Sequence, residues 1–136
     1  MEDIIRKQKQ FKHPIARVWE AISVADQIST WFIQADFKAE VGYHYTFTHQ
    51  GTKITGEVLI ASPVHELVYT WMVSGTETVT TVRWILTEYE NGTILTLEHS
   101  GISGYPATMA VTMFENFNNG WHSCVENLEK HLAGMN

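Results

Sequence analysis

His99 is the polar residue with the best prospects for chemistry, because it closes the last predicted strand beside a loop with two glycines. Strand alternation places it on the face shared with Leu95 and Leu97, which is expected to look toward a C-terminal helix. An imidazole there could exchange a hydrogen bond with a ligand. The alternative is a histidine whose nitrogens are satisfied by a backbone carbonyl or by Ser100, which would fix the loop.

No second ionisable group is predicted beside His99. Glu98 is its neighbour in sequence but points to the opposite face, so the two cannot form an acid–base pair unless a bulge intervenes. His44 and His49 are five residues apart on one predicted strand and face opposite sides, which is unsuitable for a shared metal ion. Nucleophile triads, phosphate-binding loops and dinucleotide fingerprints are also missing from the sequence. We therefore expect no catalytic residue, no metal and no cofactor.

Large apolar side chains could line a cavity between strands and helix. Aromatic rings can stack on a flat ligand, and methionines adapt to ligands of varied shape. For each of them the alternative is ordinary core packing. The predicted ligand-binding residues are Trp31, Phe47, Tyr69, Trp71, Trp84, Leu97, His99, Met109, Met113 and Phe117. We expect the ligand to gain access beside the loop from Ser100 to Tyr105.

The element that must position these residues is a long helix near the end of the chain. From Ala107 to Leu132 the apolar residues recur at helical spacing, which predicts more than twenty helical residues with one aromatic-rich face. The segment from Val41 to Ser100 alternates as antiparallel strands do. A sheet that covers so long a helix has to curl around it, and the gap between them is a natural small-molecule cavity. Gly120, before Trp121, is expected to let a strand approach the helix closely.

The other elements follow from alternation, turn residues and capping signals. Ser23 and Asp26 fit a capping box at the start of a second short helix that ends near Thr30. Asn91-Gly92 predicts a hairpin with a type I′ turn. The predicted strands are Ile4–Phe11, Gly42–His49, Lys53–Ala61, His65–Val73, Val79–Glu88 and Thr93–His99, and a first helix follows Pro14. We expect an α+β domain over residues 1–136, with a curved antiparallel sheet of about six to seven strands.

Composition narrows the class of protein. The chain has 136 residues and a net charge of −6, which argues against general nucleic-acid affinity. No uncharged stretch predicts a membrane span, the first seven residues do not form a signal peptide, and the lone Cys124 fits a reducing cytosol. We expect a cytoplasmic protein. Five of the nine basic residues fall in the first 17 positions, either as charge on an edge strand or as a docking surface for an acidic partner. They are Arg6, Lys7, Lys9, Lys12 and Arg17.

Several stretches, taken together, resemble a known superfamily. The run from His13 to Ile22, followed by Ile28 to Phe32, resembles the opening of START-like proteins. It is most similar to the group related to the C-terminal domain of the activator of the heat-shock-protein-90 ATPase. Further matching stretches are Val41 to Phe47, Gly56 to Pro63 with Leu67 to Trp71, Gly92 to Gly101, and Asn119 to Trp121 with its helix.

The resemblance implies the helix-grip fold, a curved antiparallel sheet wrapped around a C-terminal helix. It also implies ligand binding, with a few members of the superfamily acting as cyclases or hydroxylase components. We predict a cytosolic protein that binds a small hydrophobic or aromatic ligand, such as a lipid, a flavonoid or a polyketide-like ring system. One alternative is a cyclase or hydrolase using His99 and a tyrosine. The other is a co-chaperone-like module of the stress response, although the sequence carries no counterpart of the separate N-terminal domain of the eukaryotic co-chaperone.

Overall fold

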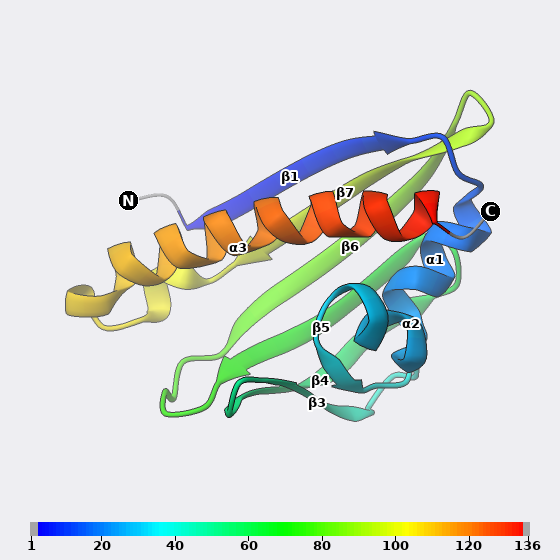
Figure 1. Cartoon of the computed structure of the whole chain (residues 1–136). Helices are drawn as coiled ribbons and strands as arrows, with labels where there is room; N and C mark the ends of the chain where they lie inside the picture. The colour runs from blue at the N-terminus through cyan, green and yellow to red at the C-terminus, as the bar shows by residue number, and fades with distance from the viewer. Residues whose placement is uncertain (1–2, 135–136) are drawn as a thin grey trace.

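Seven antiparallel strands form one curved sheet that holds a long helix against its concave face (Figure 1). The computed structural model describes residues 3–134. The strands are β1 (Ile4–Phe11), β2 (Gln34–Asp36), β3 (His44–His49), β4 (Thr52–Ser62), β5 (Glu66–Val73), β6 (Thr80–Tyr89) and β7 (Gly92–Ser100). The helices are α1 (Ile15–Ser23), α2 (Ala25–Trp31), the short 3-10 turn η1 (Ile102–Gly104) and α3 (Ala107–Ala133). This confirms the predicted α+β class and the helix-grip arrangement.

The sheet order is β1-β7-β6-β5-β4-β3-β2, so the first two strands form opposite edges. Between them, α1 and α2 carry the chain from one edge to the other and lie near the C-terminal end of α3 (Figure 1). From β3 onward the strands follow one another through short connections. Most predicted boundaries agree with the structure within two residues, but β2 was not predicted. Three residues are too few to show an alternation that sequence patterns can detect.

The predicted capping box at Ser23 is wrong. Ser23 is the last residue of α1, and its hydroxyl donates to the carbonyl of Trp19 at 2.6 Å. The second helix begins only at Ala25, and no side chain caps it. A buried serine satisfies its hydroxyl on the preceding turn of its own helix, and so it is not available as a cap for the next one.

The predicted β6–β7 turn is displaced by one residue. Glu90 and Asn91 have the positive φ angles, 48° and 67°, while Gly92 already pairs with Tyr89 in the ladder. A Cβ atom at Gly92 would lie 2.2 Å from the carbonyl oxygen of Phe11. This glycine is therefore needed for a close approach to β1 rather than for the turn itself.

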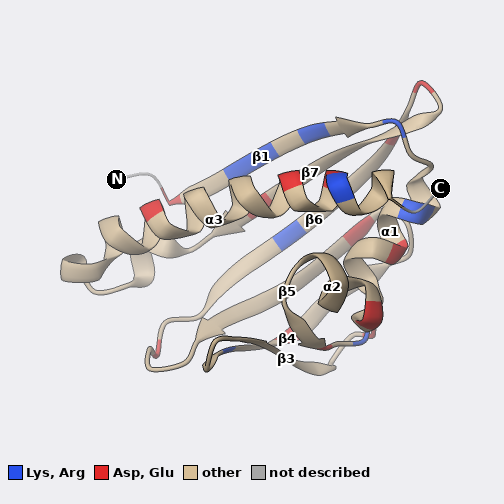
Figure 2. Cartoon of the chain, viewed as in Figure 1, with Lys and Arg blue, Asp and Glu red and all other residues tan. Residues whose placement is uncertain are grey.

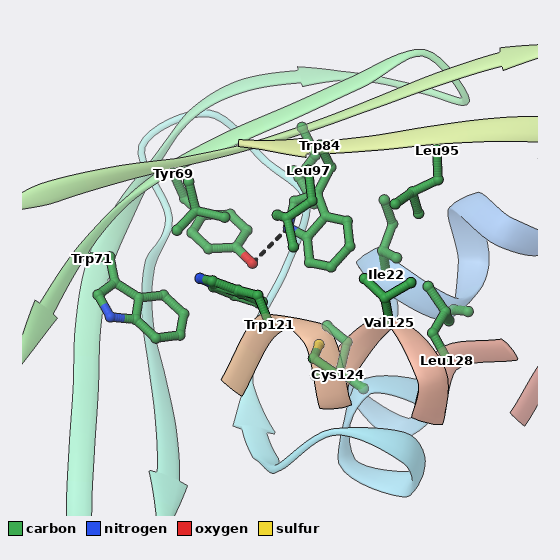
Figure 3. Packing of buried hydrophobic residues seen from close by; sticks show 14 of the residues in the cluster. Ile22, Tyr69, Trp71, Trp84, Leu95, Leu97, Trp121, Cys124, Val125 and Leu128 are labelled. Atoms are coloured by element: carbon green, nitrogen blue, oxygen red, sulfur yellow. Dashed lines mark hydrogen bonds between the residues drawn. The ribbon is translucent and has the colours of Figure 1, made fainter. Parts of the chain in front are cut away.

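The centre of the molecule is filled with aromatic and aliphatic side chains from the concave face of the sheet and from α3 (Figure 3). The ring centroids of Trp84 and Trp121 are 5.9 Å apart and the ring planes meet at 87°. Aromatic pairs favour this edge-to-face arrangement. Trp84 also donates from its indole nitrogen to the hydroxyl of Tyr69 at 2.9 Å. Strand and helix are thus locked together at this level, with the core continuing toward Leu128.

Charged residues lie mainly on the outside of this core (Figure 2). Glu98 accepts from Arg6 at 2.7 Å, and Arg83 pairs with Glu66 at 2.6 Å. Lys9 of the edge strand β1 lies 3.4 Å from Glu129 of α3. Part of the basic N-terminal segment is therefore occupied with partners from this chain. No helix of the described part of the chain has both the length and the apolar character needed to cross a bilayer.

Candidate functional site

A cleft of about 630 Å³ opens between α3, the connection from α2 to β2, and the strands β3 to β5. Its walls are mainly apolar and aromatic, and its polar side chains are uncharged hydroxyls and amides together with one imidazole, His49. The lining residues are Phe32, Ile33, His49, Thr52, Ile54, Trp71, Asn116, Phe117, Gly120, Trp121, Ser123, Cys124 and Asn127. A cleft of this size and character is typical of small-molecule sites.

The helix contributes two parallel rows of residues to the cleft. Asn116, Gly120, Ser123 and Asn127 recur every three or four positions, so they fall on one side of α3. Phe117, Trp121 and Cys124 form the neighbouring row, which turns toward the sheet. A polar row of small and amide side chains therefore borders an aromatic one along the mouth of the cleft.

Gly120 does not have the role that the sequence suggested. A Cβ atom built there would meet nothing within 4 Å, so no strand approaches the helix at this residue. The prediction of a close strand contact is wrong. Glycine inside a helix costs about 1 kcal/mol relative to alanine, and no contact within the described chain accounts for that cost. The absent side chain instead leaves the helix backbone open toward the cleft.

The cleft carries no fixed charge among its described lining residues, since it contains neither Asp, Glu, Lys nor Arg. Cys124 contributes to the wall but is 3% exposed, and burial raises the pKa of its thiol. A buried neutral thiol is a poor nucleophile. Within residues 3–134, no three His, Cys, Asp or Glu side chains are grouped as a metal site requires.

His99 lies just behind the cleft, fully buried and hydrogen-bonded through both ring nitrogens. The indole nitrogen of Trp121 donates to its Nδ1 at 2.8 Å, and its Nε2 lies 2.6 Å from the hydroxyl of Thr80. Because an indole can only donate, Nδ1 must be the unprotonated nitrogen, and the proton is on Nε2. Thr80 in turn donates to the carbonyl of Trp71 at 3.2 Å. This chain of bonds fixes a single neutral tautomer.

Burial lowers the pKa of His99 to about 3. Protonation would also place a proton on Nδ1, against the indole N–H of Trp121, so the hydrogen bonds act in the same direction as burial. The ring of Phe117, 4.6 Å away between centroids, packs against the imidazole. Both ring nitrogens of His99 have hydrogen-bond partners, as the alternative interpretation of the sequence expected. The partners are Thr80 and Trp121, not Ser100 or a backbone carbonyl. An acid–base role at neutral pH does not suit this environment.

The predicted ligand-binding residues separate into three groups in the structure. Trp71 and Phe117 line the cleft. Met109 lines a second hollow of about 620 Å³ between residues 75–79 and 104–109, and Met113 is half-buried against the core. The remaining six are buried in the packed interior: Trp31, Phe47, Tyr69, Trp84, Leu97 and His99.

The loop expected to border the ligand's access route contributes to the second hollow, not to the cleft. Gly104 and Tyr105 line that hollow. Phe117 lines the cleft, and its ring lies 6.1 Å from that of Tyr105, which lines the second hollow, and 6.4 Å from that of Trp71, between centroids. The cleft is thus reached from the side of α3 that faces the β3–β4 hairpin.

Trp71 differs from the other buried tryptophans in its hydrogen bonding. Trp31, Trp84 and Trp121 each donate from the indole nitrogen to an oxygen or nitrogen 2.7–2.9 Å away. The Nε1 of Trp71 has no partner, although this residue is 4% exposed. A buried donor left unpaired costs about 1–3 kcal/mol, so this one is an unusual feature of the wall.

Comparisons with known proteins agree with this architecture. A crystal structure of protein MLL2253 from Mesorhizobium loti is 26% identical, with a TM-score of 0.89 and 98% of each chain covered. A solution structure of protein BH1534 from Bacillus halodurans is 31% identical, with a TM-score of 0.81 and 97% of each chain covered. A crystal structure of CalU16 from Micromonospora echinospora is 26% identical, with a TM-score of 0.76, covering 95% of this chain and 75% of the other.

Among curated proteins, none matches the chain. The family model described as "Activator of Hsp90 ATPase homolog 1-like protein" matches residues 12–133, nearly the whole length. The resemblance that the sequence motifs suggested is therefore confirmed, and with it the START-like architecture. This chain belongs to the family of activator of Hsp90 ATPase homolog 1-like proteins.

Proposed function

We propose that this protein binds a small, uncharged, flat aromatic molecule in the cleft between α3 and the sheet. The observation that carries this proposal is the cleft itself, a hollow of about 630 Å³ whose described lining contains no Asp, Glu, Lys or Arg and includes the rings of Trp71 and Phe117. Aromatic walls favour flat apolar ligands, because stacked and edge-to-face contacts add to the burial of apolar area. Asparagine, serine and threonine at the rim would hydrogen-bond the ligand's polar groups.

Gly120 supports the same proposal. Glycine in the helix interior is unfavourable for the isolated chain, and a Cβ atom there would meet no other part of the protein within 4 Å. A ligand lying flat against the helix would use that space. Trp71 and Phe117, both predicted from the sequence as ligand-binding residues, would contact it from the other sides.

The alternatives from the sequence stay predictions. For the enzyme, a cyclase or hydrolase would need an acid–base pair, and His99 is held in a neutral tautomer behind Phe117. For the co-chaperone, Arg6 and Lys9 of the basic segment are paired with Glu98 and Glu129. Neither arrangement favours these functions over ligand binding.

The test is to fill the cleft from the helix side. Gly120→Leu places a branched side chain into the empty space without requiring a change of backbone, because Gly120 does not have a positive φ. Binding of anthracene, flavone and a fatty acid would be measured by tryptophan fluorescence and by chemical shifts of Trp71 and Phe117. We expect the aromatic compounds to bind. Gly120→Leu should lower their affinity by about tenfold or more, which corresponds to about 1.4 kcal/mol of binding free energy.

Asn119→Leu is the matched control, because Asn119 is the exposed neighbour of Gly120 and is not among the residues lining the cleft. Its affinities should stay within about twofold of those of the unchanged protein. If neither the aromatic compounds nor the fatty acid shifts the resonances of Trp71 and Phe117, ligand binding in this cleft is contradicted. If only the fatty acid does so, the aromatic preference is contradicted.

A further inference from the structure

The unpartnered indole nitrogen of Trp71 indicates what the buried end of a ligand should carry. Three other buried tryptophans have acceptors, so the fold can supply them where a donor is purely structural. Trp71 has none, and it is the buried tryptophan of β5 that also forms part of the cleft wall. An acceptor brought by a ligand would complete its bonding.

The rings around Trp71 leave this nitrogen without an acceptor. Trp121 packs near one part of the indole, at 5.2 Å between centroids, and Figure 3 shows the nitrogen on the side of the ring away from Trp121. The imidazole of His99 is 5.6 Å away between centroids, but both of its nitrogens are already bonded, to Trp121 and Thr80. The rings of Phe47, at 6.1 Å, and Phe117, at 6.4 Å, offer no acceptor.

Phe117 is the movable member of this enclosure. It is half-buried and belongs to the lining of the cleft, and its ring packs near that of Tyr105. Because the Trp71 nitrogen is buried, a ligand reaches it only if a neighbouring side chain shifts, and Phe117 is the half-buried ring of the cleft lining that packs edge to face on Trp71. Trp71, by contrast, is buried in the sheet and held by rings on several sides, so its donor direction is fixed before a ligand arrives.

We infer that the ligand is a planar polycyclic aromatic ketone, whose carbonyl oxygen accepts a hydrogen bond from Nε1 of Trp71. This inference rests on the proposed function and adds the chemical group that orients the ligand. A neutral carbonyl suits a cleft whose described lining has no fixed positive charge to balance a carboxylate or a phosphate. The flat ring system would then extend along Gly120 toward Ser123 and Asn127 at the mouth.

The test uses two compounds of the same shape, 9-fluorenone and fluorene, which differ by the carbonyl oxygen. We expect the unchanged protein to bind fluorenone about tenfold more tightly than fluorene. The reason is that fluorenone gives the indole nitrogen of Trp71 an acceptor, whereas fluorene leaves it unpaired. In Trp71→Phe the ratio should fall to about one, through loss of fluorenone affinity. Trp31→Phe is the control, because Trp31 donates to the carbonyl of Ala21 and is outside the cleft lining. There the preference should be retained.

A spectroscopic measurement keeps the inference testable if Trp71→Phe does not fold. In uniformly 15N-labelled protein, the indole N–H proton of Trp71 should move downfield with fluorenone and not with fluorene, whose ring-current effects are similar. If both compounds bind with equal affinity and equal Trp71 shifts, the carbonyl inference is overturned while ligand binding stands. If neither compound binds, the proposed function fails for flat aromatic molecules, and the inference fails with it.

Discussion

The two halves of α3 face very different surroundings although they belong to one uninterrupted helix. In the C-terminal half, Trp121, Cys124, Val125, Leu128 and Leu132 are all buried. In the N-terminal half Ala110 alone is buried among the described residues, and its neighbour Val111 is 58% exposed. Met109, Met113 and Phe117 there are only half-covered. The C-terminal half closes the core, whereas the N-terminal half is loosely covered and borders the second hollow at Met109. The cleft runs along the middle of the helix, from Asn116 to Asn127.

This contrast explains where binding is possible. Close packing around Leu128 leaves no space that a ligand could enter without displacing protein atoms. Phe117 borders the cleft, and Met109 borders the second hollow, so side chains in this part of the helix are only partly held by neighbours. Trp121 marks the boundary between the cleft and the core. It lines the cleft, and its indole nitrogen donates a hydrogen bond to His99, which is buried in the core.

The largest expected effect is a difference in stability between the two halves. Leu128→Ala removes a fully buried side chain and should lower the free energy of unfolding by about 2–5 kcal/mol. Met113→Ala, at a half-covered position, should cost less than half as much, because less apolar surface is buried there. Urea unfolding followed by circular dichroism measures both. Equal losses would show that the N-terminal half is packed as firmly as the other.

A second effect concerns the boundary and depends on pH. The unfolded chain takes up the imidazole proton of His99 near pH 6.5, whereas in the folded protein burial lowers its pKa to about 3. Between these values the unfolded state binds more protons, so His99 makes stability fall as the pH is lowered from 6.5 toward 3, by up to about 1.4 kcal/mol per pH unit. Above pH 6.5 it contributes no pH dependence.

His99→Gln provides the comparison, because a glutamine can accept from Trp121 and donate to Thr80 without titrating. The difference in unfolding free energy between the two proteins should shift in favour of the variant as the pH falls from 6 to 4. Urea titrations at several pH values measure that difference. If it stays constant across this range, the histidine is not held neutral by its surroundings, and the boundary at Trp121 is looser than described.

The architecture could be predicted because its signals are long and regular. Strand alternation from Gly42 to His99 and helical spacing from Ala107 to Leu132 extend over many residues, and tertiary contacts reinforce them. The short strand Gln34–Asp36 carries too few residues for such a signal. The turn before Gly92 was displaced because a glycine can serve a turn or a close approach, and sequence alone does not say which.

The site was harder to predict than the fold. Periodicity shows which residues turn inward, but whether they fill the interior or border a hollow depends on how far the sheet curls. Trp71 and Trp84 have the same strand pattern, yet one lines the cleft and the other is sealed in the core. A usable signal did exist, since Asn116, Gly120, Ser123 and Asn127 form a row of small and amide side chains beside the apolar face of α3.

The smallest expected effect tests whether the helix backbone at Gly120 is left uncovered for a ligand. Gly120→Ala should raise the free energy of unfolding by about 0.4–1 kcal/mol, because alanine restricts the unfolded chain and improves helix propensity. The new methyl group meets no protein atom within 4 Å, so no strain offsets this gain. The same methyl group should lower the affinity for a flat ligand by a few-fold if the ligand lies against the helix backbone. Thermal unfolding and fluorescence titration of one variant measure both quantities. A stability gain without any loss of affinity would place the ligand elsewhere in the cleft, whereas a stability loss would mean that α3 is packed more tightly at Gly120 than at its neighbours.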